Sequence, residues 1–135
     1  MTPHLIAMNR RISRSIGLAL ACTGAPVWAQ PAGPDPDAAL YIESVVLAKR
    51  GPLCAARLPG YADAFEPVFV KWQAERAPQL QRGEALLREA IAKEQLDFAM
   101  HLSALTDPPA RHLGKATQSV LETNCQAMLR RLGGP

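Results

Sequence analysis

Apolar residues recur at intervals of three and four positions along most of this chain. At about 100° per residue, that spacing places them on one face of an α-helix. No stretch alternates apolar and polar residues with the β-branched and aromatic enrichment of a strand. The pattern therefore predicts an all-α fold, a small antiparallel bundle of about four helices.

The first predicted helix is bounded by an aspartate cap and by a Gly-Pro pair. Asp35 or Asp37 can accept hydrogen bonds from the free backbone N–H groups of the first turn. Pro36 suits that turn, where a backbone N–H has no partner within the helix. Gly51 followed by Pro52 predicts the end of this helix.

A stripe of large apolar side chains identifies the second helix. Its members recur at helical spacing and are Tyr61, Phe65, Val68, Phe69 and Trp72. A domain of this size needs such side chains for its own core, so we expect them to be buried. In the alternative interpretation they line a groove for a partner, and Tyr61 and Trp72, near the helix ends, show an edge to solvent.

Proline residues govern the bounds of the second and third helices. If the second helix begins at Asp63, Glu66 completes a capping box and Pro67 falls in the first turn, whereas an earlier start forces a kink. Pro78 either opens a third helix or bends a longer one. We expect the chain to break at Pro78.

The last two predicted helices lie on either side of a proline pair. Apolar spacing supports a third helix over residues 79–105. The following turn, residues 106–109, offers Asp107 as a cap and Pro108 as the first residue of the last helix. Gly133 can end that helix.

The beginning of the chain has the composition of a secretory signal peptide, residues 1–29. Three arginines precede an uncharged run, residues 16–27, and the small residues around Trp28 suit cleavage after Ala29. The uncharged run is shorter than the roughly 20 residues that a membrane-spanning helix needs. We therefore expect a periplasmic or secreted protein without a membrane span after leader removal, whether Met1 or Met8 is the start.

Two other export routes fit the leader less well. Arg10 and Arg11 could belong to a twin-arginine signal, but Ser13 and Arg14 follow where apolar residues are usual. Cys22 could accept a lipid, but the residues before it match a lipobox poorly. Ordinary Sec export is the expectation.

Removal of the leader changes the charge balance. The full chain has 15 Lys and Arg and 12 Asp and Glu, and the leader takes three arginines with it. The remaining part is close to neutral, so an electrostatic footprint for nucleic acid is missing and we expect no nucleic-acid partner. Its first residues, 30–36, form a proline-rich flexible lead-in to the helical domain, residues 37–133.

Cleavage leaves two cysteines, Cys54 and Cys125. In an oxidising compartment such a pair normally forms a disulfide, and only one intramolecular pairing is possible. The functional alternative, a redox or metal-binding thiol pair, lacks a Cys-x-x-Cys motif. We expect a structural disulfide.

The sequence suggests one metal site as an alternative. His101 and His112 flank the turn predicted at residues 106–109, and Asp97 lies one helical turn before His101. In a helical hairpin these three side chains could share a groove and bind zinc or copper. A solvated or hydrogen-bonded role for each histidine is the simpler interpretation.

No catalytic constellation is visible. Ser44, Ser103 and Ser119 lie within predicted helices, and none stands in a Gly-x-Ser-x-Gly elbow. We expect no cofactor. The sequence therefore favours a small exported, disulfide-bridged protein that binds another envelope or extracellular protein in an inhibitor, immunity, assembly or accessory role. The alternatives are a periplasmic transition-metal-binding protein and a small enzyme.

Overall fold

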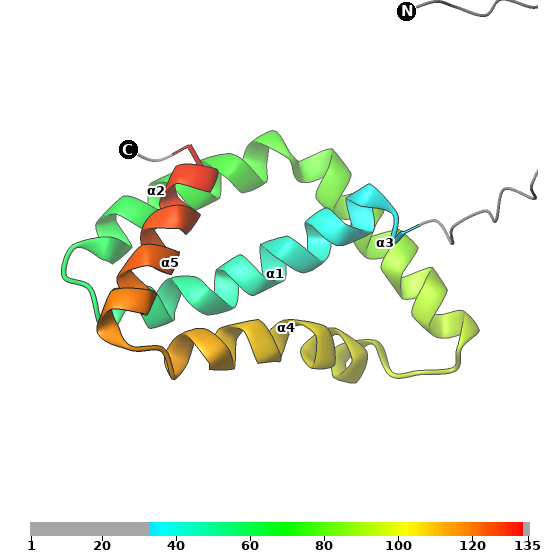
Figure 1. Cartoon of the computed structure of the whole chain (residues 1–135). Helices are drawn as coiled ribbons and strands as arrows, with labels where there is room; N and C mark the ends of the chain where they lie inside the picture. Colours follow the sequence, from blue (N-terminus) through cyan, green and yellow to red (C-terminus); the bar gives the residue numbers. More distant parts are fainter. Residues whose placement is uncertain (1–32, 134–135) are drawn as a thin grey trace, which may run out of the picture. The chain divides into compact units, whose positions relative to one another are not determined.

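A computed structural model describes residues 33–133 of the chain, so the predicted leader lies outside the described residues, as does the start of the lead-in. Those residues form five helices and no strand (Figure 1). The helices are α1 (Pro36–Ala55), α2 (Tyr61–Glu75), α3 (Ala77–Lys93), α4 (Phe98–Gly114) and α5 (Gln118–Arg131). The all-α prediction is confirmed, but the structure has five helices rather than four.

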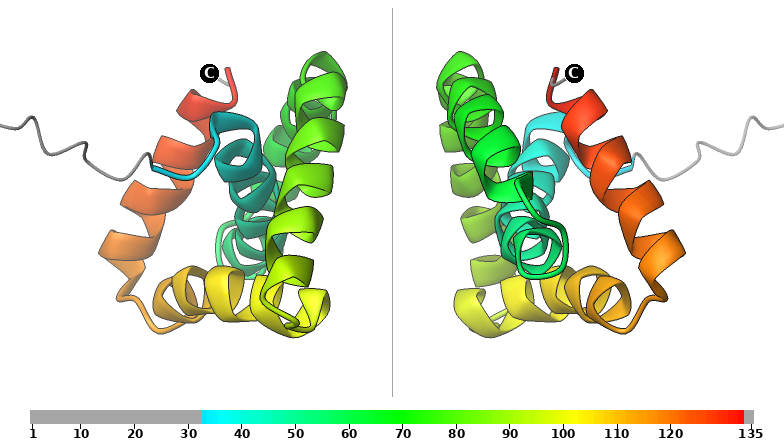
Figure 2. Two further views of the ribbon diagram at one scale, coloured as in Figure 1. Left: turned by 90° about the vertical axis from the view of Figure 1, so that its right-hand side faces the viewer. Right: turned by 90° about the vertical axis from the view of Figure 1, so that its left-hand side faces the viewer.

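Helix α1 is the centre of the helical unit. It contacts each of the other four helices. Figure 2 shows it between α5 on one side and α2 with α3 on the other, with α4 crossing beneath them. A helix surrounded in this way needs no single apolar stripe, because different faces pack against different neighbours.

The start of α1 agrees with the prediction, but its end does not. Asp35 Oδ1 accepts a hydrogen bond from the backbone N–H of Asp37 at 2.8 Å, and Pro36 stands in the first turn. The helix then continues through Gly51 and Pro52 to Ala55. It continues because Gly51 is buried against α2, and that packing outweighs the one hydrogen bond that Pro52 cannot donate.

Helix α2 begins at Tyr61, two residues before Asp63. Gly60 has a φ of 76° and turns the chain into the helix in a left-handed conformation that glycine adopts without strain. Of the two starts that the sequence left open, the structure has the earlier one, so Asp63 forms no capping box and Pro67 lies inside the helix. The break before Pro78 is confirmed, since α2 ends at Glu75 and α3 begins at Ala77.

The third predicted helix, residues 79–105, is in fact divided between α3 and α4. Gln95 adopts a φ of 57°, which ends the helical path. Asp97 then caps α4, because its carboxylate accepts a hydrogen bond from the Met100 N–H at 2.8 Å. Residues 94–97 contain neither glycine nor proline, so the sequence rules for helix ends could not predict this break.

The turn predicted at residues 106–109 is also wrong, because α4 runs through both prolines. Lys49 of α1 holds this part of α4. Its Nζ donates to the Thr106 hydroxyl at 2.7 Å and pairs with the Asp107 carboxylate at 2.5 Å. Thr106 is completely buried and donates to the Leu102 carbonyl within α4, and Leu113, beyond the prolines, is buried in the core. Packing on both sides of the prolines therefore favours one continuous helix.

The contact between Lys49 and Asp107 makes stability depend on pH. The hydrogen bond from Lys49 lowers the pKa of the Asp107 carboxyl, so the folded state binds its proton more weakly than the unfolded chain. This stabilisation is present above the unfolded pKa of about 4 and is lost as the pH falls through the lower folded pKa. Replacing Lys49 with Met should therefore cost more stability at neutral pH than in acid.

Urea unfolding of the original chain and of Lys49→Met at several pH values measures this difference. We expect the gap between their midpoints to narrow as the pH falls below about 4. Lys71→Met is a matched control, because it also removes a lysine from an ion pair. Lys71 is well exposed and its Nζ lies 3.9 Å from the Glu75 Oε1, so the loss of that pair should change stability little at any pH. A gap that stays constant with pH would contradict the role of Asp107.

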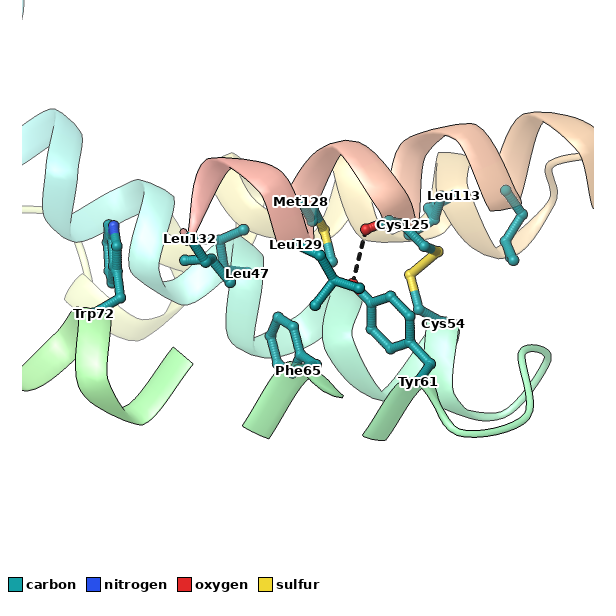
Figure 3. Packing of buried hydrophobic residues seen from close by; sticks show 11 residues of the cluster. Leu47, Cys54, Tyr61, Phe65, Trp72, Leu113, Cys125, Met128, Leu129 and Leu132 are labelled. Carbon is teal, nitrogen blue, oxygen red and sulfur yellow. Dashed lines mark hydrogen bonds between the residues drawn. A yellow bond between two sulfur atoms is a disulfide. The ribbon is translucent and has the colours of Figure 1, made fainter. Parts of the chain in front are cut away.

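The hydrophobic core joins α1, α2 and α5 (Figure 3). The rings of Tyr61, Phe65, Phe69 and Trp72 stack along α2 with neighbouring centroids 5.6, 5.1 and 6.1 Å apart. The Tyr61 hydroxyl donates to the Cys125 carbonyl of α5 at 3.1 Å, and burial raises the pKa of Tyr61 to about 12. The aromatic stripe is thus chiefly a core element.

Candidate functional site

The predicted disulfide between Cys54 and Cys125 is confirmed. It joins the last turn of α1 to the middle of α5, with the two Cα atoms 5.9 Å apart. Both cysteines are completely buried (0% exposed). A thiol-exchange partner would have no access to the sulfur atoms in the folded chain, so this geometry supports a structural role.

Tyr61 and Trp72 do not form the surface that the partner hypothesis required. Both are buried, with exposed fractions of 3% and 5%, because α5 covers Tyr61 and the core encloses Trp72. Of the two residues expected to be buried between them, Phe65 is buried and Phe69 is only partly buried. The exposed edge of the aromatic stripe therefore lies at its middle rather than at its ends.

The structure does not bring together the residues of the metal hypothesis. His101 and His112 lie on the same helix rather than on two arms of a hairpin, since α4 continues through the prolines between them. Eleven residues of helix separate them by about 16 Å. Asp97 caps the helix. Among residues 33–133, no group of three or more His, Cys, Asp or Glu side chains is placed to hold a metal ion.

An apolar groove between α1 and α2 is the candidate functional site, called the α1–α2 groove below. Its volume is about 500 Å³. The lining residues are mostly small or aromatic: Ala48, Gly51, Pro52, Ala55, Ala56, Ala62, Phe65, Glu66 and Phe69. Such a hollow, apolar with one polar side chain, has the composition of a binding site.

The side chains of α1 explain why this groove exists. Residues 48, 51, 52, 55 and 56 recur at helical spacing, and none has a side chain larger than proline. At Gly51 the Phe65 ring of α2 occupies the space that a side chain would fill, since a Cβ there would lie 2.3 Å from the ring. The small residues on either side have no such partner, and a hollow remains.

Glu66 is the one charged residue that lines the α1–α2 groove. It is exposed and forms no salt bridge within residues 33–133. Val70, 63% exposed, follows one helical turn later and continues the apolar surface along α2. The site therefore combines an apolar floor with one free negative charge at its edge.

Sequence reasoning missed this site. The run of small residues on α1 was a usable signal, but Gly51 and Pro52 were interpreted as a helix end. That error hid the surface on which Ala48, Ala55 and Ala56 lie together. Two residues of the aromatic stripe, Phe65 and Phe69, line the other wall of the groove.

No protein-family model, curated protein or solved structure matches this chain. Within residues 33–133, no helix is both long and apolar enough to cross a membrane. The geometry of the described residues therefore has to carry the functional argument.

Proposed function

We propose that this protein is an exported, disulfide-bridged helical protein that binds another protein of the envelope or extracellular space through the α1–α2 groove. The observation that carries this proposal is the apolar hollow of about 500 Å³ beside the exposed Val70. Solvent-exposed apolar surface of this kind is a common feature of protein interaction sites. The disulfide supports an oxidising destination, as the predicted leader does.

The chemistry of the groove defines the partner segment. Its floor of alanine, glycine and proline leaves room for the apolar side chains of that segment, while the Phe69 ring offers an aromatic contact. Glu66 pairs with no cation within residues 33–133, so a lysine or arginine of the partner segment would complement it. The proposed ligand is therefore a short apolar segment with one basic residue.

A photo-crosslinking residue at Ala48 tests this proposal. Ala48 is exposed and lines the groove, so a benzophenone side chain there should join the chain covalently to its partner in producing cells. The matched control is Ala85, which is exposed on α3 and lines none of the hollows described for residues 33–133. We expect one defined adduct from position 48 and none from position 85.

Charge reversal in the probe-bearing chain separates specific docking from nonspecific adhesion. Glu66→Lys should reduce the adduct by about tenfold, because it places like charges opposite each other. Equal adducts from both positions, or an adduct that Glu66→Lys leaves unchanged, would contradict the proposed site. Mass spectrometry of the purified chain tests export separately, with Gln30 as the expected first residue.

A further inference from the structure

Arg50 occupies an unusual position where α1, α4 and α5 meet. It lines two hollows, one of about 420 Å³ between α1 and α5 and one of about 270 Å³ that α4 and α5 border. Asn124 lines both hollows as well. The two side chains thus form the wall between them.

The guanidinium of Arg50 is partly buried and has no ion-pair partner within residues 33–133. Its Nη2 donates to the neutral Asn124 amide oxygen at 3.1 Å, but its Nε is buried and has no hydrogen-bond partner. Burial accordingly lowers the pKa of Arg50. A partly buried cation without a carboxylate partner can be stabilised by an anion that approaches it.

Asn124 holds the guanidinium in place rather than neutralising it. Its Nδ2 donates to the Val120 carbonyl at 2.8 Å, which aims its Oδ1 at Arg50. The arginine is therefore oriented before any ligand arrives. A preoriented guanidinium is well suited to a carboxylate, because its N–H groups match the two oxygens.

The charges around the two hollows favour the smaller one for an anion. The hollow between α1 and α5 contains the Glu43 carboxylate, which Arg131 already pairs at 2.6 and 2.9 Å. The lining of the smaller hollow contains no acidic residue. His112 lies there beside Arg50, and the apolar walls include Pro109 and Val120.

We propose that the hollow lined by Arg50, His112 and Val120 binds a small organic carboxylate. The carboxylate accepts hydrogen bonds from the Arg50 guanidinium, and the His112 imidazole offers a second donor. A short aliphatic or aromatic stem packs against Pro109, Leu113 and Val120. The volume, near the lower end of ligand sites, restricts the stem to a few carbon atoms or one ring.

Titration of the full chain with benzoate, followed by amide NMR shifts, tests this site. Benzoate should shift the backbone signals of Leu113 and Asn124, and benzamide, which has the same shape without the charge, should bind about tenfold more weakly. Arg50→Gln should weaken benzoate binding by about the same factor. Equal affinities for benzoate and benzamide, or no shift at the highest benzoate concentration used, would overturn the proposal.

A second variant keeps the test informative if Arg50→Gln alters folding. Val120 is 51% exposed, so Val120→Trp can fill the hollow from the surface without disturbing the core. Thr123→Trp is the matched control, because Thr123 is exposed on the same helix and lines none of the described hollows. We expect Val120→Trp to abolish the benzoate shifts and Thr123→Trp to preserve them. Retained binding in Val120→Trp would reject the site.

Discussion

Replacing Cys54 and Cys125 together with alanine should lower the free energy of unfolding by about 4 kcal/mol. The disulfide joins residues separated by 71 positions, so its loss frees a long loop in the unfolded chain. Unfolding entropy therefore rises. For a domain near 100 residues, each kcal/mol corresponds to about 4 to 8 °C in melting temperature, which gives an expected decrease of about 16 to 32 °C.

Thermal unfolding followed by circular dichroism measures this effect. Reductant added to the folded original chain is the control, and it should act slowly because both cysteines are completely buried. Reduction in denaturant followed by refolding should reproduce the lower melting temperature of the double variant. A double variant that melts within about 5 °C of the original chain would contradict the expected contribution of the disulfide.

The second large effect is expected from Gly83→Ala. An alanine in place of glycine inside a helix ordinarily stabilises it by about 0.5 to 1 kcal/mol. At Gly83 the added Cβ would lie 2.0 Å from the backbone oxygen of Asp37 in α1, and backbone cannot move aside as a flexible side chain can. We therefore expect destabilisation by about 3 kcal/mol, the opposite sign.

Gly114→Ala is the matched control for this prediction. Its Cβ would meet nothing closer than the Leu53 side chain at 4.0 Å, so the ordinary helical preference should apply there. Urea unfolding of both variants measures the difference. If Gly83→Ala were as stable as the original chain, α1 and α3 would not approach each other as closely as the structure indicates.

The sequence was informative where one residue decides the local structure. Asp35 caps α1 because its side chain reaches two free backbone N–H groups, and the chain breaks before Pro78 because proline suits a first helical turn. The disulfide followed from counting, since only Cys54 and Cys125 remain after the predicted cleavage. None of these conclusions required knowledge of distant contacts.

The predictions failed where contacts between helices outweigh local preference. Pro108 and Pro109 predict a turn, but α4 is packed on both sides of them. Lys49 holds Thr106 before the prolines, and Leu113 is buried in the core after them. Gly51 predicts a helix end, but it serves to admit the Phe65 ring. No local rule connects residues so far apart in the chain.

The same reason explains why the two hollows could not be located from the sequence. The α1–α2 groove exists because small residues of α1 face α2, and the Arg50 hollow exists because three helices converge. Both depend on the relative placement of helices. A sequence pattern fixes which face of a helix is apolar, but it does not fix which neighbour that face meets.

The central position of α1 has a consequence for the order in which the chain is made. Helix α1 is synthesised first among the five, yet its partners extend to α5 near the carboxyl end. A growing chain that stops before Gln118 leaves Cys54 without its partner and one side of α1 uncovered. The nascent protein therefore cannot complete its fold until α5 has been synthesised. Truncated products should be substrates for chaperones and proteases.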